Sequence, residues 1–237
     1  PGPRLEEIRK SFEYWYPLDW NCSAHELIKN HMTFFAFHHS VLLKEKHWPK
    51  GEASWGVGLL ESQKMASSKG IVLLASDAIE QFGADTVRLF LMSSVEPWQD
   101  FNWRKAEVEN YVKRIGWFHN KIVDLYGSGK DKPLRNIDNW ILTKLQEAIK
   151  ETTHALEGFQ TRKASLKGFF DMSDHVKWYE RRGSLNRTVI NQVLEDWVKL
   201  VAPLIPHTCE ELWERMGKKK FVLGSEYPTY DKNLVDN

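Results

Sequence analysis

The sequence has few cysteines and no long apolar run, and each shortage excludes a class of protein. Its 237 residues include two cysteines, Cys22 and Cys209, far apart in the chain. Isolated thiols argue against a disulfide framework and a metal site, and they are typical of a reducing compartment. No run of about 18 apolar residues occurs, so no membrane span is expected, and PGPRLEEIRK at the start has no signal-peptide core. We therefore predict a cytoplasmic protein without a metal site.

Net charge is also low, at +1, but it is unevenly distributed. Residues 104–237 hold 23 Lys/Arg against 19 Asp/Glu, whereas the first 103 residues hold 10 against 13. A mildly basic second half suits a phosphate backbone, although a solvated helix surface explains the same balance. The hydrophobic content of 42% and eleven tryptophans indicate a folded chain with large side chains in cores or interfaces.

The first hundred residues predict an α/β arrangement. Residues 12–19 are rich in aromatic side chains and end at Pro17 and Asp19, which predicts a strand. Residues 23–45 have helical spacing, with Ser23 and Glu26 forming a capping box. Glycines break residues 48–60 into two short strands. A strand, a long helix and another strand predict a β-α-β unit.

Helices are predicted from there to the C-terminus. Two short helices are expected between Ser76 and Leu91, separated by Gly83. Apolar residues at helical spacing then predict a five-helix bundle with short loops. The expected helices are 104–126, 137–157, 162–182, 187–202 and 207–216. A short strand is expected within residues 218–228.

Residues 64–70, KMASSKG, form the segment best suited to chemistry. The segment is short, cationic and rich in hydroxyl groups, and it follows an apolar strand-like run. Lysine ammonium groups in such a loop can neutralise charge on a polyphosphate, and small residues allow the backbone to close over it. Without its context, a solvated surface loop is the better explanation of this composition.

The context resembles one family along nearly the whole chain. KMASSKG resembles the KMSKS signature of class I aminoacyl-tRNA synthetases. The flanking segments EYWYPLDW, HELIKNHMTFFAFHH and DAIEQFGADTVRLFLMSS resemble the leucyl-tRNA synthetases of archaea and eukaryotes, as do IDNWILTKLQEAI, VKWYERR and LEDWVKLVAPLIPHTCEELWERMG. The resemblance implies the second half of a Rossmann-like catalytic domain in residues 1–103 and an anticodon-binding helix bundle in residues 104–237.

The resemblance also implies the activity and its site. Such an enzyme joins leucine to tRNA at the expense of ATP, with Mg²⁺ accompanying the nucleotide. Catalytic roles fall on Lys64, Ser67 and Lys69. ATP contacts fall on Lys64, Met65, Ser68, Ala24, Glu26 and Gly56.

Several of these positions depart from the family pattern. Ala66 stands where the family has the first serine of the signature, and Ser67 stands where it has the second lysine. Ala24-His25-Glu26 replaces Gly-x-Asp, and Trp55-Gly56-Val57 replaces Asn-Gly-His. The His-Ile-Gly-His signature and the editing insertion are absent from this sequence. We therefore expect the chain to require an N-terminal catalytic half, in cis or as a separate subunit, and to be inactive alone.

The resemblance also implies that the helical part packs against tRNA and holds the phosphate backbone of the tRNA. Lysine and arginine suit this role, because phosphate contacts provide affinity without reading sequence. The candidates are Lys113, Arg114, Lys121, Arg162, Lys163, Lys177, Arg181 and Arg182. Arg181 and Arg182 follow Trp178 and Tyr179, an arrangement that can stack on an unpaired base or simply complement a helix dipole.

Three alternatives stay open. The chain can belong to a catalytically degenerate tRNA-binding paralogue or accessory subunit, as the altered signature suggests. It can belong to a sister synthetase for isoleucine, valine or methionine. It can also be a helical interaction module that binds no nucleic acid.

Overall fold

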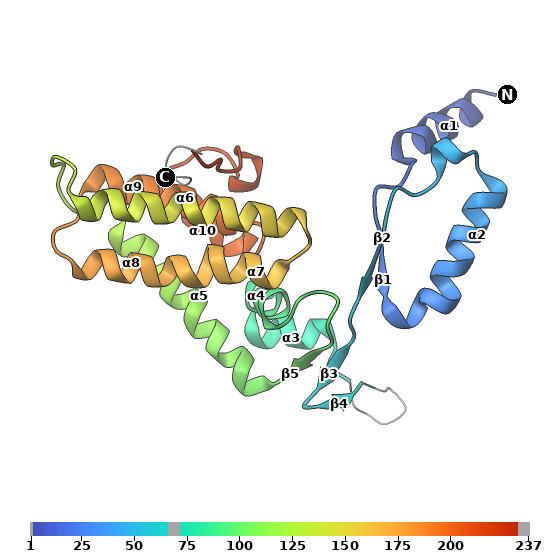
Figure 1. Cartoon of the computed structure of the whole chain (residues 1–237), viewed down its shortest axis with the longest axis horizontal. Coiled ribbons are helices and arrows are strands. Elements are labelled where there is room, and N and C mark those ends of the chain that lie inside the picture. The colour runs from blue at the N-terminus through green and yellow to red at the C-terminus, as the bar shows by residue number, and fades with distance from the viewer. Residues whose placement is uncertain (1, 66–71, 232–237) are drawn as a thin grey trace. The chain divides into compact units, whose positions relative to one another are not determined.

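The computed structural model describes residues 2–65 and 72–231, and the chain divides into two compact units (Figure 1). The first contains residues 1–58 and 98–101, and the second contains residues 59–97 and 102–237. The two helices that follow the KMASSKG segment pack with the helical unit. Among the described residues, no helix is both long and apolar enough to cross a membrane.

The first unit is built around a parallel β-α-β crossover. Strands β1 (Asn21–Ala24) and β2 (Glu52–Trp55) pair in parallel, with Ala24 opposite Trp55. Four helical segments connect them: a 3₁₀ turn η1 (His25–Leu27), a π segment η2 (Ile28–Met32), helix α2 (Thr33–Leu42) and a 3₁₀ turn η3 (Glu45–His47). A β-α-β unit is therefore present as predicted, but its first strand is β1 and not residues 12–19.

Two local predictions in this unit were wrong. Residues 12–19 are not a strand, because helix α1 (Pro3–Trp15) covers the first half of them and the rest has no regular structure. Proline at the first helical position and an Arg9–Glu13 ion pair of 3.2 Å favour this helix, whose period begins upstream of the aromatic cluster. Ser23 lies in β1 and does not cap the crossover helix, which starts at His25 after a cap residue without a side-chain hydrogen bond.

Aromatic contacts, rather than a buried core, hold the first unit together. Tyr16 stacks on Phe12 and on His39, with ring centroids 4.6 and 5.7 Å apart. Met32 is the one hydrophobic residue that is buried among the described residues of this unit. Large apolar side chains on α1 and α2 stay exposed, among them Trp15 (69%) and Leu42 (73%).

The second unit begins with short strands and two helices. Strands β3 (Gly58–Leu60), β4 (Gln63–Lys64) and β5 (Phe101–Trp103) form a small sheet in the order β4-β3-β5. Helices α3 (Ala75–Phe82) and α4 (Ala84–Ser94) follow, separated by Gly83 at φ +84° as predicted. This left-handed backbone conformation favours glycine.

The rest of the second unit is the helix bundle. Its elements are α5 (Lys105–Leu125), α6 (Asn136–Glu157), α7 (Thr161–Ser165), the π segment η5 (Leu166–Asp171), α8 (Met172–Arg181), α9 (Arg187–Val201) and α10 (Pro206–Arg215). Helix α6 packs against α7, α8 and α9. The five predicted helices are confirmed, with α7, η5 and α8 forming the third without a break.

The bundle encloses a continuous apolar core. Trp197 is fully buried at its centre, and its ring lies edge-on to Phe118 with centroids 4.7 Å apart. The Trp197 indole N–H donates to the Gly168 carbonyl over 2.7 Å, so the buried polar group is satisfied. An α/β part followed by a helix bundle therefore describes the chain, as the sequence predicts.

The C-terminal segment is not a strand, contrary to prediction. The Glu210 carboxylate accepts hydrogen bonds from the backbone N–H groups of Val222 (2.7 Å) and Leu223 (3.1 Å). These bonds turn the chain into a 3₁₀ helix, η6 (Val222–Gly224), that packs on α10.

Candidate functional site

Three of the predicted ATP-binding residues lie at one edge of the first unit. Ala24 ends β1, Glu26 follows in η1, and Gly56 comes directly after β2. Because β1 and β2 are parallel and Ala24 is opposite Trp55, all three lie at the carboxyl ends of the strands. Open α/β sheets bind their ligands at this edge.

Contacts within the chain account for the glycine at position 56. A Cβ atom there would lie 2.1 Å from the Gln99 carbonyl oxygen, so no larger residue fits against the backbone of Gln99 and Asp100. The Asp100 carboxylate accepts a hydrogen bond from the Val57 N–H over 2.8 Å. Gly56 therefore has a packing role that needs no nucleotide.

His25 contributes polar groups to this edge. Its Nδ1 atom lies 3.2 Å from the Trp55 carbonyl oxygen and 4.0 Å from the Asp100 carboxylate. The imidazole, the carboxylate and the exposed Glu26 thus gather where the two strands end. Sequence reasoning missed Asp100, which is distant in the chain and has no motif to mark it.

The second unit carries the start of the signature loop. Lys64 ends β4 and its side chain is exposed, and Met65 follows half-buried. The remaining predicted loop residues, Ser67, Ser68 and Lys69, lie outside the described residues, as does Ala66.

Pairing with carboxylates divides the predicted tRNA-binding cations into two groups. Lys163 pairs with Glu151 over 2.9 Å, and Lys121 pairs with Glu180 over 2.8 Å. The side chains of the other members form no ion pair with a carboxylate within residues 2–65 and 72–231, apart from Lys177, which pairs with Asp174. These unneutralised cations are Lys113, Arg114, Arg162, Arg181 and Arg182. The backbone N–H of Arg162 donates to the Glu96 carboxylate over 3.2 Å.

The tryptophan before the double arginine is covered by one of those arginines. The Arg182 guanidinium carbon lies 4.1 Å from the Trp178 ring centroid, a cation–π contact on an exposed surface. Tyr179 is 1% exposed and belongs to the core. The structure therefore leaves Arg181 and Arg182 accessible but assigns Tyr179 a structural role.

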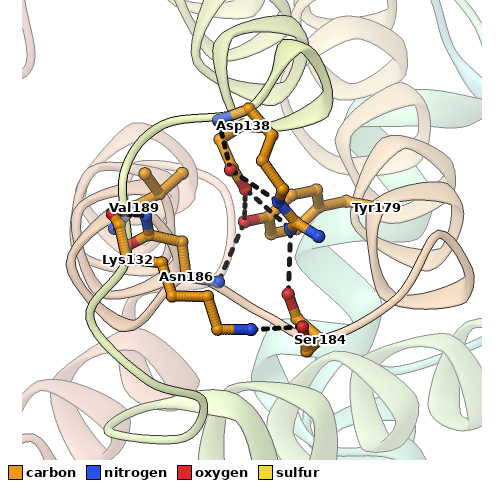
Figure 2. Close-up of polar contacts among 7 residues, drawn as sticks. Lys132, Asp138, Tyr179, Ser184, Asn186 and Val189 are labelled. Atoms are coloured by element: carbon orange, nitrogen blue, oxygen red, sulfur yellow. Dashed lines mark hydrogen bonds and ion pairs between the residues drawn. The ribbon is translucent and has the colours of Figure 1, made fainter.

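A buried polar cluster positions the loop that follows these arginines (Figure 2). The Asp138 carboxylate accepts hydrogen bonds from the Arg135 Nε (3.0 Å) and from the Tyr179 hydroxyl (2.5 Å). Arg135 also donates to the Ser184 carbonyl over 2.8 Å, and the Asn186 side chain donates to the Lys132 carbonyl over 2.9 Å. The segments 130–138 and 179–189 are thereby held together.

The protonation states of Asp138 and Tyr179 suit the hydrogen bonds of this cluster. Burial raises the pKa of Asp138, but the hydrogen bonds from Arg135 and Tyr179 outweigh it and lower that pKa to about 2. Burial and the bond to Asp138 raise the pKa of Tyr179 to about 12. At neutral pH the carboxylate is therefore charged and the phenol keeps its proton.

A small cavity between α5 and α8 brings three of the predicted cations together. Its volume is about 130 Å³, and its lining residues are Lys113, Arg114, Trp117, Phe169, Ser173 and Lys177. Sequence reasoning missed Trp117, although its spacing of four and three residues from Lys113 and Arg114 on one helix was a readable signal.

No cluster of three or more His, Cys, Asp or Glu residues suitable for a metal occurs in the described part of the chain. Cys22 is exposed and Cys209 is buried, and both are free thiols. Burial first, and then Asp85, raises the pKa of the Cys209 thiol well above its usual range.

Comparison with known proteins identifies the family. The model of the class I (M) tRNA synthetases matches residues 4–115, and the model of the anticodon-binding domain of tRNA ligase matches residues 138–237. The chain is 46% identical over 235 residues to the leucine–tRNA ligase of Pyrococcus horikoshii, covering 96% of the chain and 24% of that protein. It is 45% identical to the leucine–tRNA ligase of Methanothermobacter thermautotrophicus, covering 95% of the chain and 26% of that protein.

The chain belongs to the leucyl-tRNA synthetase family. It spans about a quarter of the length of the leucyl-tRNA synthetases that it matches.

Solved structures agree with the fold of this family. A LeuRS from Agrobacterium radiobacter, determined as a ternary complex with tRNA and LeuAMS, matches 92% of the chain with a TM-score of 0.78 at 24% identity; the match covers 29% of that protein. A methionyl-tRNA synthetase of Mycobacterium tuberculosis, in complex with methionyl-adenylate, matches 86% of the chain and 45% of its own length with a TM-score of 0.71 at 16% identity. The leucyl-tRNA synthetase fold thus extends through both units.

Proposed function

We propose that this chain supplies the signature loop and the tRNA-binding helices of a leucine–tRNA ligase. Identity of 46% to a leucine–tRNA ligase over 96% of the chain carries the proposal. A sister synthetase for methionine is less well supported, since the methionyl-tRNA synthetase structure shares 16% identity with the chain. The complete reaction would need the parts of the relatives that lie outside the matched quarter.

In the proposed reaction, ATP with Mg²⁺ activates leucine, and the leucyl group then passes to tRNA. Lys64, Ser67 and Lys69 are the proposed contacts to the reacting phosphates, with Met65 and Ser68 beside them. The charge and exposure of Lys64 suit a polyphosphate. The strand-end residues Ala24, Glu26 and Gly56 are proposed to line the nucleotide site, which fits their place at the carboxyl edge of β1 and β2.

The proposed organisation assigns residues 1–103 to the catalytic domain and residues 104–237 to the tRNA-binding bundle. Five cations are proposed to contact the phosphate backbone of tRNA, because no carboxylate among the described residues forms an ion pair with their side chains. They are Lys113, Arg114, Arg162, Arg181 and Arg182. Lys163 is a weaker candidate, since Glu151 already pairs with it. The proposed partner is an N-terminal catalytic part, and the proposed location is the cytoplasm.

Binding of tRNA by the 237-residue chain tests the proposal directly. Leucine tRNA and a mismatched tRNA would be titrated at several salt concentrations. We expect binding that weakens steeply as salt rises, because phosphate contacts release counterions. Absence of binding at low salt to either tRNA would contradict a tRNA-binding role for this chain.

The altered signature favours a second candidate, a tRNA-binding paralogue with weak adenylation. Ser67 replaces a lysine of the family pattern, and loss of one such stabilising group costs about 2.7–4 kcal/mol in comparable sites. ATP–pyrophosphate exchange would be measured after reconstitution with the N-terminal part. Slow exchange that Ser67→Lys raises about 100-fold supports the degenerate enzyme, whereas fast exchange by the unchanged protein excludes it.

A further inference from the structure

The cavity between α5 and α8 has the composition of an anion site. Lys113, Arg114 and Lys177 contribute three cationic side chains to its lining, and no carboxylate is among the lining residues. A volume of about 130 Å³ holds several waters, and so it also admits a tetrahedral oxyanion.

Aromatic rings hold two of these cations in place. The Lys177 ammonium lies 4.5 Å from the Trp117 ring centroid, and the Arg114 guanidinium carbon lies 5.0 Å from the Phe170 ring centroid. Cation–π contacts of this kind restrict the two side chains before any ligand arrives. Lys177 thereby covers one face of Trp117, the ring that lines the cavity, so that face is closed to a stacking base and a cation stands beside the cavity instead.

Acidic groups near the cavity only partly cancel its charge. Asp174 lies 2.9 Å from Lys177, but its side chain is 77% exposed, which leaves the contact screened by water. Lys113 and Arg114 have no acidic partner in the described part of the chain. The Ser173 hydroxyl donates to the Phe169 carbonyl over 2.6 Å, so the cations are the donors left for an anion.

We propose that this cavity binds a single backbone phosphate of tRNA, held jointly by Lys113, Arg114 and Lys177. The proposal rests on the proposed tRNA-binding function and adds a defined subsite to it. In this subsite the three cations share one phosphate, whereas three independent surface contacts would each bind a different phosphate.

The salt dependence of tRNA binding separates these two arrangements. Each neutralised phosphate contributes about 0.7–0.9 to the slope of log K against log salt, the lower value for single strands and the higher for a duplex. Replacing all three cations by glutamine should therefore reduce the slope by about 0.7–0.9 if they share one phosphate. A reduction of about 2.1–2.7 indicates three separate contacts and overturns the proposal. An unchanged slope overturns it while leaving the proposed function intact.

A matched variant controls for the loss of three charges. Lys167→Gln, Lys199→Gln and Arg215→Gln remove three cations from the same unit, none of which lines the cavity, and each of which pairs with a carboxylate over 2.7–2.9 Å. We expect this variant to keep the wild-type slope, and circular dichroism would confirm that both triple variants are folded. An equal drop in slope in both variants overturns the proposal.

Inorganic phosphate tests the cavity without tRNA. The indole N–H resonance of Trp117, assigned by its loss in Trp117→Phe, should shift saturably with phosphate and should stay still in the triple variant of the cavity. If the wild-type chain binds no tRNA, the proposed function fails. The phosphate titration alone then decides whether the cavity binds an oxyanion. A shift then supports an oxyanion site, and no shift overturns it.

Discussion

Asp138 shows at the level of one residue how this bundle tolerates a buried charge. Its side chain has no exposed surface, and it accepts hydrogen bonds from the Arg135 backbone and guanidinium and from the Tyr179 hydroxyl. A buried carboxylate is costly unless such donors surround it. The cluster joins the start of α6 to the end of α8, so the charge also connects distant segments of chain.

Replacing this carboxylate should destabilise the bundle. Asp138→Asn removes the charge that Arg135 and Tyr179 face, and we expect a loss of about 1.5–3 kcal/mol in the free energy of unfolding. Urea unfolding followed by circular dichroism would measure it. Asp174→Asn, in an exposed pair on α8, is the control and should cost less than about 1 kcal/mol. Equal losses in the two variants would contradict the role of the cluster.

Acid should weaken the same cluster in a defined range. The pKa of Asp138 is about 2 in the folded protein, against 3.8 for an ordinary aspartate. Because the folded pKa is the lower one, the stabilisation is complete above pH 4 and disappears as the pH falls through 2. The shift corresponds to roughly 2 kcal/mol. Urea midpoints measured between pH 5 and 2 should fall more steeply for the wild type than for Asp138→Asn, and parallel curves would refute the assignment.

The candidate residues were predictable where a motif marked them and obscure where partners came from elsewhere in the chain. The cations of α5 and α8 could be read from the sequence as solvent-facing, but which of them were neutralised could not. Lys121 and Glu180, for example, are 59 positions apart. Tyr179 looked like a partner of Arg181 and Arg182, whereas tertiary packing turned it inward toward Asp138.

At the scale of the elements, one helix caps another. The buried Asp85 near the start of α4 accepts hydrogen bonds from the N–H groups of His207 (3.3 Å) and Thr208 (2.6 Å) and from the Thr208 hydroxyl (2.6 Å). The two backbone N–H groups lie in the first turn of α10 and have no acceptor within the helix. The negative charge of Asp85 there also complements the helix dipole. The capping residue lies more than 120 positions upstream, so a local capping rule could not find it.

Loss of this cap should destabilise α10. Asp85→Ala leaves three donors of α10 without their acceptor, and we expect the unfolding free energy to fall by about 1–2 kcal/mol. Asp77→Ala in α3 is the matched control, since Asp77 is exposed and accepts a hydrogen bond only from the neighbouring Ser76 in the described part of the chain. Chemical denaturation would compare them, and a change below about 0.5 kcal/mol for Asp85→Ala would argue against the cap.

Periodicity predicted the helices of the bundle, which have a buried face, and failed at helix α1, which has none. Helix α9 buries eight residues at regular spacing, and its bounds agree closely with the prediction. Helix α1 buries none, so its aromatic end was mistaken for a strand. The tail around Val222 was missed because Glu210, on another element, decides its conformation.

At the scale of the whole molecule, the two units differ in how much core they possess. The bundle has a continuous cluster of buried side chains, whereas α1 and α2 bury no residue. Stability within a chain follows buried apolar contacts, so the first unit should open far more readily. The family resemblance predicted both halves of the architecture, but composition alone did not predict this inequality.

Hydrogen exchange should reveal the difference between the units. We expect peptides from α1 and α2 to lose protection at least about 100-fold sooner than peptides from α9, because local opening there exposes little additional apolar surface. Exchange measured by mass spectrometry on the intact chain would test this. Peptides from α6, which buries eight residues, are the internal control and should behave like α9. Uniform protection across the chain would contradict two units of unequal stability.

The π segment η5 accommodates one extra residue within a single turn, because a π turn contains one residue more than an α turn. The helix beyond it therefore keeps its rotational phase, so Tyr179 still faces Asp138 and Lys177 still faces Trp117. A one-residue deletion within η5 should leave α8 aligned, whereas the same deletion in an ordinary α turn would rotate all later side chains by about 100°. The π segment is thus the one place in this helix where the chain length can change without misaligning the buried cluster and the cationic cavity.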